Sequence, residues 1–521
     1  MSRHLKHMAG MSLGTLFSRL TGFVKWAFMG AVLGFSPIAD AYNLAHILPT
    51  MIYELILGGI LSAVFIPVVV EQLSSPDKEQ AWKNISQIVN AALIALGATT
   101  LLCWIGSPLL VYLQTLKAGP ELRRQVLFFF IFFVPQIILY GLSALAGGIL
   151  NARDRFVVVA LAPVVNNVIA IMTLAAYRWV PGFGIVGLAL GTTLGVLGQA
   201  LVQYPGLKKA GWRYHFSINF KHPAVIKIVK LSLPVLAYVI LNQINLTVQN
   251  NLAINFQGGV SALQYAFAFY VLPHGLFAVS IGTVLLPGLS ELAVKKDWPR
   301  FAGTVEKGII WSAIVIIPAL VIYLTLSLPI VQVLMQRGRF TLQDTRLMAT
   351  VLSCYSLGLF SFTIYLFLNR VFYSLQDTVT PLALNFVGNA SNTIINFALV
   401  GLLGIPGLAL GHAAAYTIIA GISLWLIKKR LPDIRLGLVS RSLIKITAAS
   451  LLTGAGAFFL NDLWLRQMGS LGLWPKAGIL TGFLSLLILL YLAAAKFFGL
   501  TETNEVVLAI KRKMAPGSSQ K

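Results

Sequence analysis

Charged side chains interrupt the first two long apolar segments of the chain, where charge is costly. Arg19 and Lys25 lie in the first segment, and Asp40 and Glu54 lie in the second, with His46 between the two acids. A charged side chain near the centre of a bilayer costs roughly 2.5–3.5 kcal/mol on insertion scales. Such residues usually face water or a partner, so the set predicts a cationic cavity for an anionic headgroup. Alternatively, Lys25 and Asp40 reach the membrane interfaces or pair with each other.

A second polar group crowds one apolar segment. Its amides are Asn242, Gln243, Asn245, Gln249, Asn250 and Asn251. Gln243 and Asn250 are seven residues apart, as are Asn242 and Gln249, so a helix presents them as two adjoining stripes. Amides can coordinate a cation or bind sugar hydroxyls, and they can equally hold helices together in lipid. Both interpretations stay open, and Asn242, Gln243 and Asn250 are candidates for substrate binding.

The sequence contains no recognisable enzyme site. Its 16 acidic residues lie mostly in loops, and we find no paired carboxylates, His/Cys cluster, glycine-rich phosphate loop or nucleophile motif. Cys103 and Cys354 each fall inside an apolar segment, with neither disulfide nor metal spacing. We therefore expect no enzymatic activity, no cofactor and no metal. Because no ATP-binding cassette is present, active transport would draw on a gradient or the membrane potential.

The elements that position these residues must be membrane helices. Hydrophobic residues make up 57% of the 521 residues and charged residues only 11%, against about 25% charged in soluble proteins. Apolar segments long enough to cross a bilayer predict an all-α polytopic membrane protein of about 14 transmembrane helices. The predicted spans are residues 9–34, 38–70, 82–112, 122–148, 155–178, 182–205, 224–255, 260–290, 302–328, 344–373, 379–402, 404–428, 437–462 and 472–497.

Basic residues cluster on one side of these predicted spans. The net charge is +23, and with this helix count the Lys and Arg clusters fall in alternate loops. The positive-inside rule then places both termini and the loop at 206–222 in the cytoplasm. Because the basic residues are scattered over short loops without a binding domain, we expect them to contact anionic membrane lipids and not nucleic acid.

An internal repeat indicates two similar halves. Residues 184–191 recur as residues 404–411 with seven identities in eight, displaced by 404 − 184 = 220 positions. Asn166 and Asn389, in the preceding segments, are related by nearly the same displacement. A membrane protein built from two similar halves is most often a transporter with its site between the halves, and the alternative is a duplication without functional trace.

Prolines interrupt the second and eighth predicted spans. Pro49 and Pro67 lie in the second span, Pro273 and Pro287 lie in the eighth, and a leucine precedes both Pro49 and Pro273. Proline removes a backbone hydrogen bond, so broken helices are expected there. In transporters such breaks line the site or act as hinges, which makes Pro49 and Pro273 candidates for gating.

Several motifs resemble the MurJ (MviN) family of lipid II flippases. The motifs are FSRLTGF at 17–23, ADAY at 39–42, LP at 48–49 with GG at 58–59 and FIP at 65–67, RGRFT at 337–341 with DT at 344–345, and NRVFYS at 369–374 with DTVTP at 377–381. They extend the resemblance over residues 9–500, which is most of the chain. The family belongs to the superfamily of multidrug, oligosaccharidyl-lipid and polysaccharide exporters.

The resemblance implies two pseudo-symmetric lobes around a central cationic cavity. It divides the chain into an N-terminal lobe at 1–222, a C-terminal lobe at 223–435, a helix pair at 436–498 that forms a groove for the lipid tail, and a cytoplasmic tail at 499–521. It implies alternating-access transfer of the undecaprenyl-linked peptidoglycan precursor, lipid II, from the inner to the outer leaflet of the bacterial plasma membrane for cell-wall synthesis. We expect the chain to work as a monomer.

Only part of the family's cationic site is present. Arg19 resembles the first cavity arginine of the family, and Asp40 resembles its acidic partner. Lys25 stands where many members have arginine, which keeps the charge but loses the bidentate fork for phosphate oxygens. Ala268 occupies the place of an arginine that precedes Leu-Pro by four residues in the eighth helix. The standard diphosphate clamp is therefore incomplete.

Other residues are candidates by resemblance or by chemistry. His46 and His274 are expected to compensate in part for the missing cations, although a lone membrane histidine is more often a packing residue. Arg370, in the turn between the tenth and eleventh helices, is expected to have a gating or structural role. Asn385 and Asn389 resemble the spacing of a sodium site in some members, so they form a possible cation site without a carboxylate.

Other functions share part of this pattern. A flippase for another polyprenyl-diphosphate-linked oligosaccharide would have the same architecture and a cationic cavity. A cation-coupled drug antiporter would need a cavity dominated by acids, which Arg19 and Lys25 contradict. A membrane glycosyltransferase or lipid phosphatase would need acidic or His-rich external loops, and the loops at 114–121 and 329–343 offer too little. Reconstituted transport would distinguish a transporter from a scaffold.

Overall fold

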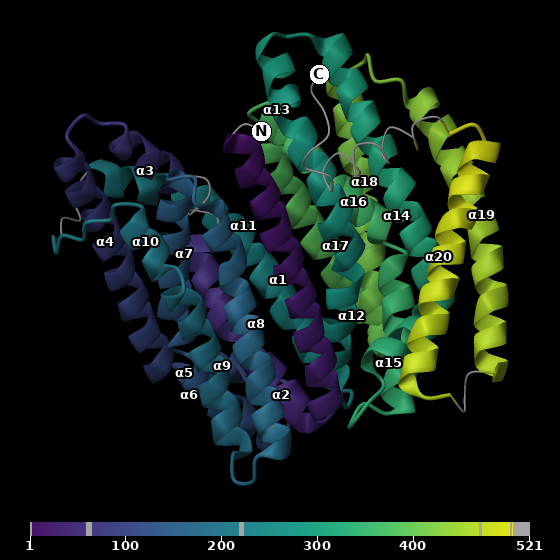
Figure 1. The fold of residues 1–521 in the computed structure, drawn as a ribbon, viewed down its shortest axis with the longest axis horizontal. Coiled ribbons are helices and arrows are strands. Elements are labelled where there is room, and N and C mark those ends of the chain that lie inside the picture. The colour runs from purple at the N-terminus through teal and green to yellow at the C-terminus, as the bar shows by residue number, and fades with distance from the viewer. Residues whose placement is uncertain (1–2, 59–64, 218–222, 468–470, 501–502, 504–521) are drawn as a thin grey trace. The chain divides into compact units, whose positions relative to one another are not determined.

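The computed structural model describes residues 3–58, 65–217, 223–467, 471–500 and 503, and over these ranges the chain is helical without any strand (Figure 1). This confirms the all-α prediction. Contacts between residues divide the chain into two units, Met1–Val260 and Ser261–Lys521. The helix at 223–253 groups with the first unit, because its side chains bond to that unit. The division at 222/223, which follows the family resemblance, stays a prediction.

The first unit is built on a hairpin of two long helices. Its helix α8 packs along both α1 and α9, and α2 packs against α6 and α7. The elements are α1 (Arg3–Leu33), α2 (Pro37–Tyr53), the π-helical turn η1 (Glu54–Gly58), α3 (Ile66–Leu73), α4 (Lys78–Ile105), α5 (Ser107–Gln114), α6 (Pro120–Phe133), α7 (Gln136–Ala152), α8 (Phe156–Trp179), α9 (Gly184–Leu201), α10 (Tyr204–Lys209) and α11 (Pro223–Ala253).

The second unit has an equivalent hairpin, and one 38-residue helix, α14, contacts most of its neighbours. The hairpin is α17 with α18, and α14 packs on α13, α15, α16 and α19. The elements are α12 (Gly259–Pro273), the π-helical turn η3 (His274–Ala278), α13 (Val279–Val294), α14 (Trp298–Met335), α15 (Leu342–Ser356), α16 (Leu359–Ser374), α17 (Val379–Leu403), α18 (Ile405–Arg430), α19 (Leu436–Gln467) and α20 (Leu473–Phe497).

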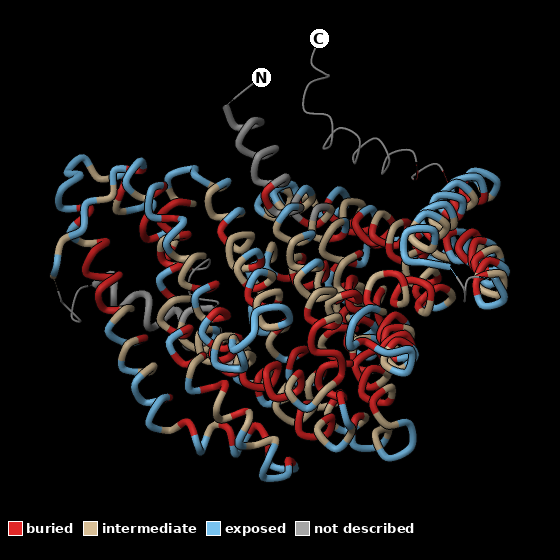
Figure 2. Tube along the Cα trace, turned by 60° about the horizontal axis from the view of Figure 1, so that its bottom comes forward, coloured by how far each residue is buried: buried red, intermediate tan, exposed pale blue. Residues whose placement is uncertain are grey.

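The predicted membrane spans correspond to helices of the structure. Among the described residues, eight helices are long and apolar enough to cross a membrane, and two bent pairs bring the number to as many as ten. The pairs are α6–α7, bent by 41°, and α15–α16, bent by 47°. Two of the other four predicted spans coincide with α1 and α11, and the span at 260–290 coincides with α12, η3 and α13. The span at 38–70 is helical in α2, η1 and α3, and its residues 59–64 lie outside the described residues. Exposed residues lie along the outer sides of the helices in Figure 2, as expected for surfaces that contact lipid.

The repeated octapeptide begins the second helix of each hairpin, and the backbone there requires glycine at its first and last positions. Its first glycines, Gly184 and Gly404, have φ of +54° and +63°, a region that favours glycine. Gly191 and its counterpart Gly411 lie against the preceding helix, where a Cβ would overlap Thr173 and Asn396, respectively. Thr173 and Asn396 are themselves displaced by 396 − 173 = 223 positions. Both hairpins therefore use the same turn and the same close helix approach.

We expect Gly191→Ala to destabilise the first unit. The new Cβ would approach the branched Cβ of Thr173 at 2.9 Å, which no side-chain rotation of that residue relieves. Overpacking of this kind costs about 1–3 kcal/mol, measurable as a lower melting temperature of the purified protein in detergent. Gly421→Ala in α18 is the control, because a Cβ there has nothing within 4 Å. Equal melting temperatures for the two variants would contradict the packing argument.

The turn before α17 is closed by a partly buried acid. Asp377 accepts hydrogen bonds from the backbone N–H groups of Val379 (3.0 Å) and Thr380 (2.9 Å), and it pairs with Arg430 at the end of α18. Burial of the carboxylate opposes its ionisation, but the hydrogen bonds from Thr380 and Arg430 outweigh it and lower the pKa of Asp377 to about 2. The acid in the DTVTP motif thus joins both ends of the α17–α18 hairpin.

Asp377→Asn should lower the melting temperature at neutral pH, by the equivalent of about 1 kcal/mol, because the amide keeps the backbone hydrogen bonds but loses the ion pair. The folded-state pKa of Asp377 is depressed, so its stabilisation is complete above the ordinary value of 3.8 and is lost as the pH falls toward 2. The difference between wild type and variant should therefore shrink below about pH 4. Asp462→Asn, which removes an exposed pair with Arg466, is the control and should have little effect. A difference that does not change with pH would disprove the assignment.

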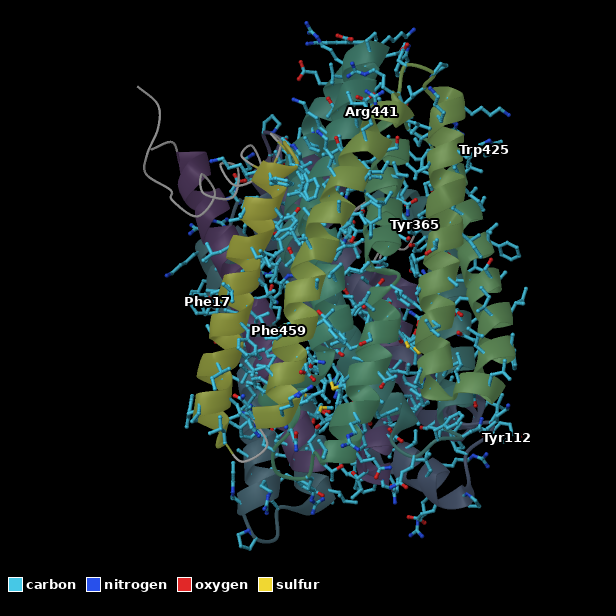
Figure 3. All side chains as sticks on the ribbon, turned by 90° about the vertical axis from the view of Figure 1, so that its right-hand side faces the viewer. Phe17, Tyr112, Tyr365, Trp425, Arg441 and Phe459 are labelled. Atoms are coloured by element: carbon cyan, nitrogen blue, oxygen red, sulfur yellow. The ribbon has the colours of Figure 1, made fainter. Side chains whose placement is uncertain are left out.

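The last two helices are fastened to α14. Trp464 of α19 donates to the side chain of Gln332 (2.8 Å), and Tyr491 of α20 donates to the carbonyl of Ile314 (2.8 Å). That carbonyl lies four residues before Pro318, which lacks the N–H that would normally bond to it. The outer face of the pair is apolar, as Phe459 illustrates in Figure 3, with 68% of its surface exposed.

Candidate functional site

Arg19 lies in a part of α1 that is hydrogen-bonded to α8 on both sides of the residue. Asn167 of α8 donates to the carbonyl of Ser18 (3.2 Å) and to the hydroxyl of Thr21 (3.1 Å), on either side of Arg19. Arg19 is half-buried, and its Nε is buried without a hydrogen-bond partner among the described residues. Lys25, six residues further along α1, is also half-buried, with Nζ 5.2 Å from the ring centroid of Trp26. An unbonded guanidinium nitrogen in a membrane helix favours an anionic ligand.

The candidates on α2 have different surroundings. Asp40 is buried in the first turn of the helix, which Ser36 caps by accepting the N–H of Ala39 (3.2 Å). A carboxylate there stabilises the helix N-terminus. The ring of His46 stacks on Tyr42 with centroids 5.8 Å apart, an arrangement that favours packing over ligand contact. The assignment of both residues to a binding site stays a prediction.

The amides of α11 divide into two groups. Gln243 donates to the carboxylate of Glu54 (3.0 Å), and Asn251 donates to a backbone carbonyl of α5 (3.1 Å), so these two amides hold helices together. Atoms of two candidates are nevertheless buried without a hydrogen-bond partner in the described structure, namely Oε1 of Gln243 and Nδ2 of Asn250. Asn242 is half-buried on the same helix. Gln243 and Asn250 thus each keep one polar atom available to a ligand.

A chain of hydrogen bonds that the sequence analysis did not single out crosses the first unit. Tyr140 of α7 bonds to Thr50 of α2 and to Asn166 of α8. Asn166 donates to Gln199 of α9 (3.1 Å), which donates to Ser143 of α7 (3.2 Å). The available signal was weak, because Tyr140 and Ser143 are three residues apart in an apolar span and share a helix face only if the register is known.

In the second unit, the predicted break at Pro273 is a π-helical turn that is braced on both sides. Because Pro273 lacks an N–H, it cannot donate the usual helical hydrogen bond to the carbonyl of Phe269. Tyr323 of α14 donates to that carbonyl at 2.8 Å. Beyond the turn, Nη1 of Arg370 donates to the carbonyl of Val279 (3.3 Å). Arg370 thus contacts the backbone beside the turn, and its gating or structural role stays a prediction. A comparable π-helical turn, η1, follows α2 and starts five residues after Pro49.

Two histidines of this unit pack among aromatic rings. His274, the first residue of η3, lies with Nδ1 3.1 Å from the hydroxyl of Thr363. His412 of α18, which the sequence analysis did not consider, has ring centroids of Tyr416, Tyr355 and Tyr270 at 4.5, 5.2 and 5.5 Å. These surroundings are apolar or neutral, so they supply no anion-binding charge beyond the imidazoles themselves.

The possible cation site on α17 consists of neutral amides. Asn389 donates to the side-chain oxygen of Asn385 at 3.1 Å, which occupies one of the two lone pairs of this oxygen. Asn392 and Asn396 continue the same helix face and are buried. Within the described residues, no group of three or more His, Cys, Asp or Glu side chains could hold a metal ion. A cation at this face would depend on amide and carbonyl oxygens alone.

The fold is that of transporters of the MOP superfamily. A solved inward-facing multidrug resistance MATE family transporter of this superfamily aligns with a TM-score of 0.61 at 14% identity, covering 83% of this chain and 94% of that chain. The structure of a lipid II flippase MurJ in an inward closed conformation aligns with a TM-score of 0.77 at 25% identity, covering 94% of this chain and 98% of that one. The class defined by fold and site is therefore a multi-pass membrane transporter.

Sequence comparisons identify the family. The family profile described as Lipid II flippase MurJ matches residues 29–476. A probable lipid II flippase MurJ of Vibrio cholerae is 30% identical, with 95% of this chain and 96% of that protein covered. A probable lipid II flippase MurJ of Bdellovibrio bacteriovorus is also 30% identical, with 98% and 97% covered. The chain belongs to the lipid II flippase MurJ family, which confirms the resemblance of its motifs.

Tyr323→Phe should destabilise the protein, because the ring is kept while the buried carbonyl of Phe269 loses its donor. An unsatisfied buried acceptor costs about 1–3 kcal/mol. Tyr491→Phe should have a similar effect at the carbonyl of Ile314, and both are measurable as lower melting temperatures. Tyr112→Phe, at a residue with 48% of its surface exposed, is the control and should leave the melting temperature unchanged. No effect from either buried variant would show that the hydroxyls are not needed by the broken helices.

Proposed function

We propose that this protein is a flippase that moves lipid II from the inner to the outer leaflet of the bacterial plasma membrane by alternating access. Membership of the MurJ family over residues 29–476 supports the substrate class. The observation in the site that carries the proposal is Arg19, whose buried Nε has no hydrogen-bond partner among the described residues. A diphosphate supplies the charge-assisted hydrogen bonds that such a group lacks.

In this proposal the cations bind the diphosphate and the neutral polar groups bind the rest of the headgroup. Arg19 and Lys25 contact phosphate oxygens. Asp40 and Glu54 orient these two cations or balance their charge. The amides Asn242, Gln243 and Asn250, with His46 and His274, offer hydrogen bonds to sugar hydroxyls and peptide groups. No covalent bond is made or broken, so the chain needs no catalytic residue.

The π-helical turns η1 and η3 are the proposed hinges. Both follow a Leu-Pro pair, at Pro49 and Pro273, and both interrupt a predicted span. Local breaks of this kind let the two parts of a helix change their relative direction while the remaining hydrogen bonds persist. Arg370 and Tyr323, which bond on either side of η3, would then set how easily this hinge moves.

The membrane arrangement is proposed from charge placement. One-sided Lys and Arg clusters favour cytoplasmic termini and contacts with anionic lipids. The helix pair α19–α20, packed on α14 with an apolar outer face, is the proposed groove for the polyprenyl tail, and the chain is proposed to work as a monomer. The face with Asn385 and Asn389 is kept as a possible cation site.

A flippase for another polyprenyl-diphosphate-linked oligosaccharide is the second candidate. Ala268 favours it, because an arginine of the family is absent there, so the headgroup contacts differ from those of many members. Rescue of cells depleted of their own lipid II flippase distinguishes the two candidates. A cation-coupled drug antiporter is less well supported, because the MATE likeness at 14% identity extends to the fold alone.

Arg19→Ala should abolish complementation of such depleted cells while the protein still accumulates in the membrane. Loss of hydrogen bonds from a charged group costs about 1.5–3 kcal/mol, a fall in lipid II affinity of roughly ten- to a hundred-fold. Lys25→Arg should be tolerated, because arginine keeps the charge and adds a bidentate fork. Arg178→Ala, at an exposed position at the end of α8, is the matched control and should complement normally.

Binding of purified protein to lipid II tests the same proposal directly. Binding by the wild type and the Arg178→Ala control, with weak binding by Arg19→Ala, would support it. Normal growth and normal binding with Arg19→Ala would remove the cationic contact. Binding of a different polyprenyl-diphosphate sugar in preference to lipid II would favour the second candidate.

A further inference from the structure

The segment between α10 and α11 is held along α4 in an extended form. Residues 212–217 have no helical structure, and they follow α10 beside the N-terminal half of α4 (Figure 1). The N–H of His215 donates to the hydroxyl of Ser86 (3.1 Å), and Gln87 donates to the hydroxyl of Ser217 (3.0 Å). Side chains of α4 thus take the place of the hydrogen bonds that a helix would provide internally.

Asn90 of α4 is the centre of this attachment. Its Nδ2 donates to the carbonyl of Ser217 (2.9 Å) and, more weakly, to that of His215 (3.3 Å), while its Oδ1 accepts the hydroxyl of Tyr214 (2.8 Å). Asn90 is only 4% exposed, so its amide would be costly to bury without these partners. The bound segment is therefore part of the fold of the first unit.

The upstream end of the segment is fixed as well. Arg153 donates to the carbonyl of Ala210 (3.1 Å) and lies over the ring of Trp82, whose centroid is 5.6 Å from that of Trp212. In the preceding α10, Gly206 is buried, and Gln203 just before it is buried against Ser143. These contacts occupy the inner side of residues 203–217 and leave the opposite side uncovered.

The uncovered side, which we term the interfacial face, combines aromatic rings with cations. Its rings are Tyr204, Tyr214 and Phe216, with 64%, 52% and 79% of their surfaces exposed, and its cations are the exposed Lys208, Lys209 and Arg213. No acidic residue occurs between positions 155 and 290 of the sequence, so nothing in this stretch neutralises these charges. The rings and cations belong to one short segment whose backbone is already ordered.

We propose that the interfacial face binds the surface of an anionic phospholipid bilayer at the cytoplasmic side. Exposed aromatic rings are typical of the boundary between headgroups and acyl chains, and adjoining cations attract anionic headgroups. The face directly continues α9, a membrane-spanning helix whose last residue, Leu201, is 60% exposed. Exposed rings beside cations also stack on nucleic-acid bases, but this face directly follows an apolar spanning helix, which places it beside a bilayer surface. The inference specifies the anionic-lipid contact within the proposed function and depends on its membrane orientation.

Because the segment is fixed to α4, its rings and cations meet the bilayer together and need no ordering on contact. The proposal therefore predicts that lipid contact depends on two separate features. The first is the charge of Lys208, Lys209 and Arg213, and the second is attachment through Asn90. Loss of either should weaken the contact with anionic lipid.

The test uses the full chain in nanodiscs with a fluorescent probe at position 216. Cys103 and Cys354 are replaced by alanine, Phe216→Cys is labelled with an environment-sensitive dye, and quenching by nitroxide-labelled lipid is measured with and without phosphatidylglycerol. We expect quenching to rise about twofold when phosphatidylglycerol is present, because the cations draw the face into the headgroup layer. The triple variant Lys208→Gln, Lys209→Gln, Arg213→Gln should lose this rise.

The matched control neutralises the same number of cations elsewhere, through Lys295→Gln, Lys296→Gln and Arg300→Gln in the second unit, and should keep the rise. Asn90→Leu removes the attachment and should reduce the rise. Tyr214→Phe removes only the hydroxyl that donates to Asn90, should also reduce the rise, and replaces Asn90→Leu if that variant does not fold. Equal quenching in both lipid compositions, or an unchanged rise in the triple variant, would overturn the proposal. Lipid II transport is not the readout, so failure here leaves the flippase proposal intact, and loss of Arg19 should not alter the quenching.

Discussion

The structure depends on one constraint, which is that backbone polar groups inside a membrane must find partners within the protein. Unbroken helices meet this requirement by themselves, but the carbonyls of Phe269 and Ile314 each lie four residues before a proline and lose their helical donor. Tyrosine hydroxyls from neighbouring helices, Tyr323 and Tyr491, replace it. At these two prolines a neighbouring helix supplies the missing donor, and Tyr323 ties the proposed hinge at η3 to the packing around α14.

The same constraint separates two kinds of polar side chain in the apolar helices. Asn90, Asn167 and Asn251 have their amides bonded to backbone groups of other segments, so they hold the fold together. Arg19 and Asn250 instead keep nitrogen atoms that are buried without partners among the described residues. A bound ligand is the simplest source of those partners. These atoms make Arg19 and Asn250 candidates for binding, while structural amides such as Gln203 also keep one unbonded atom among the described residues.

The two hairpins share the same close packing between their helices. A left-handed glycine starts the second helix of each hairpin, and a second glycine seven residues later lets that helix approach the first. The polar residues between the two helices differ. Thr173 packs against Gly191 in the first hairpin, and Asn396 packs against Gly411 in the second. Helix packing is thus the shared feature of the two hairpins, while the polar chemistry is specific to each.

Most of the architecture was accessible from sequence, and most of the site was not. Long apolar segments in a chain with few charges require membrane helices, and the repeat at 184–191 and 404–411 predicted two similar halves. The structure shows that each copy begins the second helix of a hairpin. Pro273 located the break of its helix closely, and Pro49 located the other to within about a turn, because a missing N–H is a local property. The motif with Arg370 identified the family, but not the carbonyl that Arg370 would contact.

The tertiary structure decided which polar residues meet. Gln243 donates to Glu54, 189 positions away, and Asn90 donates to a carbonyl about 125 positions away. His412 packs against tyrosines of three helices. Periodicity assigns a residue to a helix face, but it carries no information about which helix lies opposite. That choice depends on side-chain shape and hydrogen bonding summed over the whole interface. Sequence therefore determined the helices and their breaks, and only the folded chain determined their partners.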